Sequence, residues 1–273
     1  MNSKIAILLP VYNAEEFLRE CLDSMIAQTY TEWELFACND GSTDSSLQIL
    51  NEYAAEDRRI TILDNPENMG VVKTLNRLLK VVPEDVDFIA RMDADDIALP
   101  DRLEKQIHYM QKNPHIDIVG GQLEIIDEKN NTLGYRRYAT DPITISKNSI
   151  CANPLAHPTV FFRKELINVL KEYRNIPGCE DYDLWLRAIQ NGAKPANLPD
   201  VILRYRISAG QIKQRDMKKS LYSTIKLQWK FLFCGKFFSF KALVHHLLVF
   251  GLFVFPDKIL LKLFMKVTYR NNI

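Results

Sequence analysis

Apolar, strand-like runs alternate with helix-like stretches through the first 115 residues, and this alternation constrains the fold more than any other feature. The run at 5–11 precedes a stretch, 14–28, in which apolar residues recur at helical spacing. Further runs at 33–38, 60–63 and 88–92 are each followed by a helix-like stretch. Such alternation is typical of a mostly parallel sheet flanked by helices. The first half of the chain is therefore predicted to form an α/β domain.

Beyond residue 115 the pattern loosens, and antiparallel strands are expected. Segments 116–126 and 133–138 alternate apolar and polar residues, whereas 181–190 has helical spacing. The composition shifts near residue 210, where we place the main boundary. We expect a domain of two halves and a helical tail, with approximate bounds 1–115, 116–210 and 211–273.

Positive charge is concentrated in the tail. Residues 211–273 hold 12 Lys and Arg against 2 Asp and Glu, a net charge of +10, whereas residues 1–210 carry −9. The longest charge-free run, 242–256, is 15 residues long, short of the ~20 residues that a membrane-spanning helix needs. No nucleic-acid-binding motif accompanies the basic charge, so nucleic acid is not an expected partner.

The end of the tail has the pattern of a helix that lies on a membrane. Lys258, Lys262 and Lys266 repeat at a spacing of four, with apolar residues between them. A helix of this kind can lie in the interface of an anionic membrane. The alternative is a helical hairpin that packs on the main domain or on a second copy of the chain. We favour the membrane, because the tail is so basic.

Cysteine usage and the N-terminus both indicate a cytoplasmic protein. The five cysteines are far apart and form no Cys-x-x-Cys pair, which argues against a zinc site and a disulfide framework. No basic leader with a cleavage site precedes the first apolar run. We expect the chain at the inner face of the cell membrane, bound peripherally through its tail.

Polar motifs follow three of the expected strands. They occupy positions 10–13, 39–42 and 93–96. Any one of them alone is better explained as an ordinary turn, because Asn, Asp and Gly favour turns. Ligands of open parallel sheets, however, bind outside the carboxyl ends of the strands. Three such motifs together therefore predict a binding site on one rim of the sheet.

The sharpest of these motifs is Asp93-Ala94-Asp95, which is followed directly by Asp96. In an extended segment, Asp93 and Asp95 point the same way. Mg²⁺ and Mn²⁺ prefer oxygen ligands and are often held by one or two carboxylates plus substrate phosphates. A helix N-terminus would explain Asp96 but not Asp93. The motif therefore predicts a divalent metal site.

A second acidic cluster, Glu180–Asp183, opens the helix-like stretch near residue 181. Helix capping explains Glu180 or Asp183 alone, but a carboxylate at such a junction is also well placed to act as a general base. His157 is expected to be a hydrogen-bonded structural residue rather than a ligand or a base.

Together these motifs resemble family 2 glycosyltransferases, inverting enzymes of the GT-A (Rossmann-like) fold, over residues 3–207. The resemblance implies transfer of a sugar from a nucleotide sugar, commonly a UDP-sugar, with Mn²⁺ or Mg²⁺. It assigns the nucleotide sugar to the first half of the domain and the acceptor to the second. The motifs that carry it are Leu9-Pro10-Val11-Tyr12-Asn13, Asn39-Asp40-Gly41-Ser42-Thr43-Asp44, Asn68-Met69-Gly70, Met92-Asp93-Ala94-Asp95-Asp96 and Glu180-Asp181-Tyr182-Asp183.

The resemblance also implies roles for single residues. Four of them would surround the base and ribose, namely Pro10, Tyr12, Glu15 and Asp40. Lys73 would lie near the nucleotide, Asp93 at the ribose or sugar and Asp95 on the metal, with Asp93 as a possible second ligand. Asp181 would be the catalytic base.

Two departures from the family pattern refine the expectation. Many relatives carry a metal-binding histidine after a Tyr-Arg pair, but here Ser208 stands beyond Tyr205-Arg206-Ile207. The Gln-x-x-Arg-Trp motif of processive relatives is not supplied by residues 211–215. We expect one sugar per encounter, added to a saccharide or lipid-linked saccharide of a bacterial surface polysaccharide (O-antigen or capsule). The alternatives are a non-catalytic nucleotide-sugar binding module and a nucleotidyltransferase of the same fold.

Overall fold

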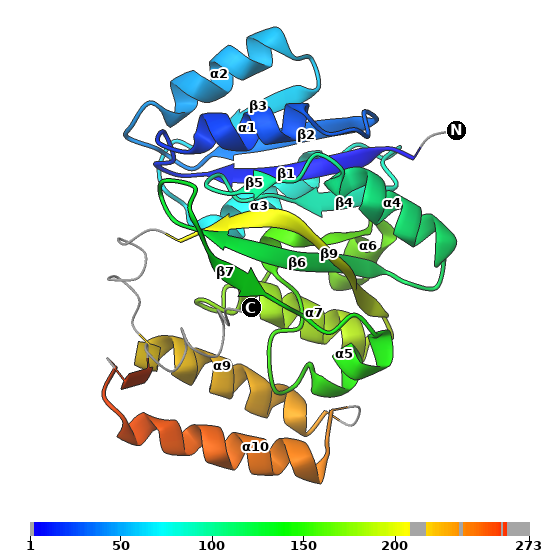
Figure 1. The fold of residues 1–273 in the computed structure, drawn as a ribbon, viewed down its shortest axis with the longest axis vertical. Coiled ribbons are helices and arrows are strands. Elements are labelled where there is room, and N and C mark those ends of the chain that lie inside the picture. Colours follow the sequence, from blue (N-terminus) through cyan, green and yellow to red (C-terminus); the bar gives the residue numbers. More distant parts are fainter. Residues whose placement is uncertain (1–2, 208–216, 235–236, 258, 261–273) are drawn as a thin grey trace.

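The computed structural model describes residues 3–207, 217–234, 237–257 and 259–260. A nine-stranded mixed sheet forms its centre (Figure 1), with the order β3-β2-β1-β4-β8-β6-β9-β5 and β7 paired to β6. The strands are β1 (Ile5–Val11), β2 (Trp33–Asn39), β3 (Ile60–Asp64), β4 (Phe88–Arg91), β5 (Ile97–Ala98), β6 (Ile118–Ile126), β7 (Thr132–Arg136), β8 (Phe161–Arg163) and β9 (Pro195–Arg206).

Helices cover both faces of this sheet. The helices of the main domain are α1 (Leu18–Ile26), α2 (Ser46–Glu56), α3 (Val71–Val81), α4 (Arg102–Lys112), α5 (Pro142–Asn148), α6 (Glu165–Leu170) and α7 (Glu180–Gln190), with a 3₁₀ turn η1 (His157–Thr159). Buried residues of α1, α2 and α4 pack on one face, and those of α3, α6 and α7 on the other. This is the α/β architecture that the alternating pattern predicts.

The sheet changes direction at its middle. β1, β2, β3 and β4 are parallel neighbours, whereas β8 pairs antiparallel with both β4 and β6. β6 and β9 are parallel to each other, so the expected antiparallel second half is in fact mixed. The long strand β9 in its full length, together with β5 and α5, was not among the expected elements. Their pairing depends on partners far away in the sequence, which a local pattern does not reveal.

The first helix of the tail packs on the main domain. The described elements of the tail are α9 (Met217–Leu232), α10 (Phe240–Phe250) and a 3₁₀ turn η2 (Gly251–Val254). Leu227 and Phe231 of α9 are buried in one cluster with Tyr182 and Leu186 of α7. Gln228 Nε2 also donates to the hydroxyl of Tyr182 at 3.1 Å. The helix α9 therefore packs on the main domain, as the packing alternative expects. The helix α10 lies on the side of α9 that faces away from the sheet (Figure 1).

The membrane alternative concerns residues farther along the tail. Lys258, Lys262 and Lys266 lie outside the described residues. Within the part of the tail that is described, the outer face of the α10–η2 segment is apolar and exposed. Its exposed apolar side chains are Phe240, Val244, Leu247, Leu248, Phe250, Val254 and Phe255. Among the residues described, no helix has the length and apolar character needed to cross a bilayer.

Candidate active site

The loops that follow β1 and β2 are bound tightly to each other. The backbone N–H of Asp40 donates to the carbonyl of Val11 at 2.7 Å. Asn13 Oδ1 accepts from the N–H of Thr43 at 2.8 Å, and the N–H of Ala14 donates to Ser46 Oγ, also at 2.8 Å. These contacts hold two of the predicted nucleotide-binding motifs side by side at the carboxyl ends of neighbouring strands.

The carboxylate of Asp40 organises a third segment. It is buried and accepts hydrogen bonds from Asn65 Nδ2 at 2.7 Å and from the N–H groups of Met69 and Gly70, both at 2.9 Å. The following residue, Gly41, has φ +68°, and a Cβ there would lie 2.4 Å from the carbonyl carbon of Glu67. Asp40 therefore fixes the Asn68-Met69-Gly70 loop directly above the Asp-Gly turn.

The other residues predicted to bind the nucleotide lie around this rim and differ in exposure and in hydrogen bonding. The ring of Tyr12 is 50% exposed and follows Pro10 at the end of β1. Lys73 is exposed on the first turn of α3, just beyond Gly70. Glu15, in contrast, accepts a 2.8 Å hydrogen bond from the N–H of Ser45 at the start of α2. Glu15 thus has a capping contact, which the sequence motif did not suggest.

The three acids of the Asp93–Asp96 segment have different surroundings. Asp93 forms an ion pair with buried Arg91 and faces a cavity. Asp96 is fully buried, and its Oδ1 accepts from the N–H of Arg206 at 2.9 Å. Burial, together with the charges of Asp95 and Asp93, raises the pKa of Asp96 well above its usual range. Repulsion between the three carboxylates is therefore reduced in two ways. Arg91 offsets the charge of Asp93, and the raised pKa of Asp96 favours its uncharged form.

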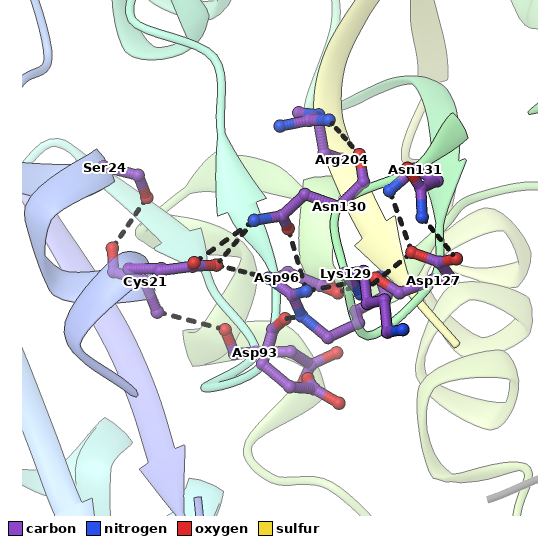
Figure 2. A network of polar contacts seen from close by, with 12 residues as sticks. Cys21, Ser24, Asp93, Asp96, Asp127, Lys129, Asn130, Asn131 and Arg204 are labelled. Carbon is purple, nitrogen blue, oxygen red and sulfur yellow. Dashed lines mark hydrogen bonds and ion pairs between the residues drawn. The ribbon is translucent and has the colours of Figure 1, made fainter. Parts of the chain in front are cut away.

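Arg206 binds this acidic segment to two other elements. Its Nε donates to the carbonyl of Asp95 at 2.8 Å, its Nη1 to Asn130 Oδ1 at 2.9 Å, and its Nη2 to Glu20 Oε2 at 2.6 Å. Asn130 lies between β6 and β7, and Figure 2 shows it in the same network of polar contacts as Asp96. Sequence reasoning did not assign Arg206 a role. The only signal was its place in the Tyr-Arg pair, and its partners are 76 to 186 residues away.

Asp181 lies in the first turn of α7. Its Oδ2 accepts from Asn153 Nδ2 at 2.7 Å, and its Oδ1 accepts from the N–H of Tyr182 at 2.7 Å. Burial is the largest cause that raises the pKa of Asp181 to about 6, and the charge of Glu180 adds to it, while the bond from Asn153 opposes the shift. A carboxylate with this pKa is mostly ionised at neutral pH and is a stronger base than an exposed aspartate.

One cavity of about 490 Å³ brings Asp93 and Asp181 together. Its wall also includes Tyr138, His157 and, from the tail helix α9, Leu221. His157 Nε2 lies 3.1 Å from the hydroxyl of Tyr173, and burial lowers the pKa of this histidine well below its usual range. His157 is hydrogen-bonded, as expected, but it also faces the cavity, which was not expected.

The acidic segment suits a divalent cation that is completed by its substrate. No group of three His, Cys, Asp or Glu side chains able to enclose a metal occurs among the described residues. Mg²⁺ and Mn²⁺, however, are often bound by one or two carboxylates together with substrate phosphates. The candidate ligands of such an ion would be the carboxylates of Asp93, which also pairs with Arg91, and of Asp95, whereas Asp96 is buried and accepts a hydrogen bond from Arg206. Ser208 lies outside the described residues.

Sequence comparison identifies the family of this chain. Residues 6–177 match Glycosyl transferase family 2. The chain is 34% identical over 233 residues to the "Putative glycosyltransferase EpsE" of Bacillus subtilis, covering 82% of this chain and 81% of EpsE. It is 32% identical over 229 residues to "UDP-Glc:alpha-D-GlcNAc-diphosphoundecaprenol beta-1,3-glucosyltransferase WfgD" of Escherichia coli, covering 82% and 83%.

Comparison with solved structures supports the fold. The structure of Staphylococcus aureus TarS 1-349 matches with a TM-score of 0.65 and 20% identity over 84% of this chain and 65% of that one. The mannosyltransferase PcManGT of Pyrobaculum calidifontis, in complex with GDP-Man and Mn²⁺, matches with a TM-score of 0.64 and 15% identity over 96% and 73%. The mixed sheet flanked by helices is thus a GT-A fold. With residues 6–177 matched, this chain belongs to Glycosyl transferase family 2.

Proposed function

We propose that this glycosyltransferase is inverting, metal-dependent and non-processive, and that it moves one sugar from a UDP-sugar to a lipid-linked saccharide. One observation carries the proposal: Asp93, from the predicted donor motif, and Asp181, the predicted base, line the same cavity. A donor and an acceptor bound there would meet between the two carboxylates. This is the arrangement that a single displacement at the anomeric carbon requires.

The described residues supply the parts of such a reaction. Asp181 would accept the proton of an acceptor hydroxyl as its oxygen attacks the anomeric carbon from the face opposite the departing diphosphate. Asn153 orients the Asp181 carboxylate through a 2.7 Å hydrogen bond. Asp93 and Asp95 would hold Mn²⁺ or Mg²⁺, which neutralises charge on a diphosphate leaving group when it is bound. No covalent sugar–enzyme intermediate is needed.

The nature of the donor follows from the rim of the sheet and from the relatives. Pro10 is near the end of β1, Tyr12 and Asp40 directly follow β1 and β2, and Lys73 lies in the first turn of α3, after β3. All four are thus near the carboxyl ends of strands, where ligands of open sheets bind. Glu15 follows β1 in the same loop as Tyr12, so we keep it in the proposed nucleotide site, although its carboxylate accepts from the N–H of Ser45 at the start of α2. TarS has been solved in complex with UDP and with UDP-GlcNAc, and the name of WfgD includes UDP-Glc. PcManGT was solved with GDP-Man instead. We favour UDP because WfgD, at 32% identity, is the most similar of these three proteins in sequence.

A lipid-linked acceptor agrees with the tail and with the relatives. The name of WfgD specifies a diphosphoundecaprenol-linked acceptor, and another relative, AmsE of Erwinia amylovora, is named for amylovoran biosynthesis. In this chain the exposed apolar face of α10 and the net charge of +10 in residues 211–273 suit an anionic membrane surface. We infer peripheral binding at the cytoplasmic face of the membrane, in synthesis of a surface polysaccharide of the O-antigen or capsule type.

Donor screening tests this proposal directly. UDP-, GDP- and dTDP-sugars are compared for thermal stabilisation of the full-length chain, with and without Mn²⁺, because a ligand that binds the native state raises the unfolding midpoint. We expect UDP-sugars to stabilise most and only with metal, and slow donor hydrolysis to accompany binding. Equal stabilisation by all three nucleotides, or stabilisation unaffected by a chelator, would contradict the proposed donor and metal.

The two alternatives, a binding module and a nucleotidyltransferase, predict different outcomes when the same protein is tested with donor and with nucleoside triphosphate. A binding module would be stabilised by the donor but would never hydrolyse it. A nucleotidyltransferase would release diphosphate from a nucleoside triphosphate. Family membership supports glycosyl transfer over both.

A further inference from the structure

A second cavity of about 420 Å³ adjoins the one that contains Asp93 and Asp181. Arg136, Tyr138 and Asn153 line both cavities, so the two meet at these side chains. The remaining wall of the second cavity comes from α5, from Arg137 and Ala139, and from Ala152 and Pro154. The proposed reaction at Asp181 makes no use of this space.

Two buried amide side chains of the sheet fix the walls of the second cavity. Asn197 Nδ2, on β9, donates to the carbonyl oxygens of Ala139 at 2.8 Å and of Pro154 at 3.1 Å, and so ties the two opposite walls together. Gln122, on β6, accepts from the N–H of Tyr138 at 2.6 Å and donates to its carbonyl at 3.3 Å. The cavity is therefore preformed, which lowers the entropy that a ligand loses on binding.

The two cavities differ in charge. The first contains the acids Asp93, Glu180 and Asp181. The described lining of the second contains no Asp or Glu, but it includes the basic residues Arg136 and Arg137. A molecule that spans both cavities would thus meet acids at one end and guanidinium groups at the other.

Arg136 has no anionic partner at this junction. Its guanidinium lies over the ring of Tyr138, 4.8 Å from the ring centre, and it is half-buried on β7. In the portion of the chain that the structure describes, no carboxylate lies within ion-pair distance of Arg136. A guanidinium held by a stacked ring presents a planar fork of donors that matches phosphate and carboxylate.

We propose that the second cavity is an acceptor subsite in which Arg136 binds an anionic group of the acceptor. This inference rests on the proposed function, because Asp181 marks where the acceptor hydroxyl must lie. From there the acceptor would extend past Asn153 into the second cavity. A sugar that carries phosphate on its anomeric carbon has a hydroxyl at one end and an anion at the other, in the order that the cavities require. An acidic sugar would present a carboxylate instead.

Ligand binding to the full-length chain tests the subsite. Titration calorimetry is performed in saturating UDP and Mn²⁺, so that the donor site is filled. The probes are the 1-phosphates of glucose, galactose, mannose and N-acetylglucosamine, the methyl glycosides of glucuronic and galacturonic acid, and the matching neutral methyl glycosides. We expect at least one anionic probe to bind about tenfold or more tightly than its neutral counterpart, as expected for a charge-assisted pair with arginine. A phosphate preference would point to a sugar phosphate, and a carboxylate preference to an acidic sugar.

Arg136→Gln should abolish this preference, and Arg136→Lys should keep part of it, because lysine retains the charge without the planar fork. Lys129→Gln is the matched control. It removes an exposed charge from the turn before β7, and Lys129 lines neither cavity. The control should retain the full preference.

Three results would overturn the subsite: no anion preference across the panel, a preference that survives in Arg136→Gln, or displacement of the probe by UDP. Donor hydrolysis measured in the same preparations separates the two proposals. Hydrolysis without an anion preference would refute only the subsite. An Arg136-dependent anion preference without hydrolysis or transfer would refute the proposed function, and with it the assignment of this anion site to an acceptor.

Discussion

The side-chain amide of Asn153 donates a 2.7 Å hydrogen bond to the carboxylate of Asp181, and the two residues meet where the first cavity opens towards the second. The bond favours the charged form of Asp181, whereas burial and Glu180 oppose it. If Asp181 is the base, as we propose, Asn153 would position it and adjust its strength.

Asn153→Ala should move the pH dependence of the reaction upward. The wild-type rate is expected to rise with pH around a midpoint of about 6, as Asp181 loses its proton. Without the amide donor, the pKa of Asp181 should increase, so activity at pH 6 falls more than activity at pH 8. Profiles of kcat/KM against pH for both proteins measure the shift. An unmoved midpoint would show that Asn153 does not act through the ionisation of Asp181.

Asp181→Asn should separate catalysis from stability. We expect kcat to fall by about 10²–10⁴-fold, as for loss of a general base, with donor binding nearly intact. Poor donor binding with normal turnover at saturation would make Asp181 a binding residue instead.

The same variant should also be more stable than the wild type above pH 6. The pKa of Asp181 is about 6 in the folded chain, against an ordinary pKa of 3.8 for aspartate, so the folded state holds this proton more tightly than the unfolded state. The contribution of this carboxyl to stability therefore declines as the pH rises from about 4 to 6. Asparagine removes that loss, which is up to about 3 kcal/mol. Chemical denaturation at pH 4 and pH 8 measures the effect, and a gain of equal size at both values would refute this cause.

Asp95→Ala should weaken donor binding that depends on Mn²⁺. The diphosphate would lose a carboxylate-held counter-charge, so both the metal-dependent thermal shift and turnover should fall severely. Asp101→Ala is a suitable control, because Asp101 pairs with Lys105 at the surface. Wild-type activity that persists in a chelator would refute the metal site altogether.

Arg206→Met should change the position of the Asp93–Asp96 segment, because Arg206 bonds the Asp95 carbonyl. Arg206 is 1% exposed and bonds the Asp95 carbonyl, Asn130 and Glu20, so its removal takes a donor away from three partly buried or exposed acceptors at once. We expect a clear drop in the unfolding midpoint and a weaker apparent affinity for Mn²⁺ in the presence of UDP. Arg204, two residues away, is more exposed than Arg206; it pairs with Glu124 and donates to the carbonyl of Asn130. Arg204→Met should cost about 1 kcal/mol or less. Equal effects of the two changes would refute the special position of Arg206.

The two helices of the tail should have different roles: α9 should stabilise the main domain, and α10 should bind the membrane. Leu247→Ser with Leu248→Ser changes two side chains that are 59% and 70% exposed, so binding to anionic vesicles should weaken while the unfolding midpoint stays nearly constant. Truncation after residue 210 should instead lower the midpoint or cause aggregation, because it removes Leu227 and Phe231 from the cluster on α7. Vesicle binding by the double variant equal to that of the wild type, at all salt concentrations, would argue against this face as the membrane contact.

The sequence alone determined the α/β core and the position of the acidic motifs. Local periodicity indicated β1 to β4 and the helices between them, because each of these strands is a short apolar run that can be recognised from its own residues. It also placed Asp93-Ala94-Asp95 after a buried strand and Asp181 at the start of a helix, as the structure has them.

Only the tertiary structure decided what these residues contact. The parallel pairing of β6 with β9, the bond from Asn153 to Asp181 and the network of Arg206 all join segments distant in sequence, and such pairings depend on packing rather than on local propensity. The same holds for the three acids at 93–96. They look alike as a motif, but burial and Arg206 set Asp96 apart from Asp93 and Asp95, because the charge of a carboxyl depends on the groups that surround it in space.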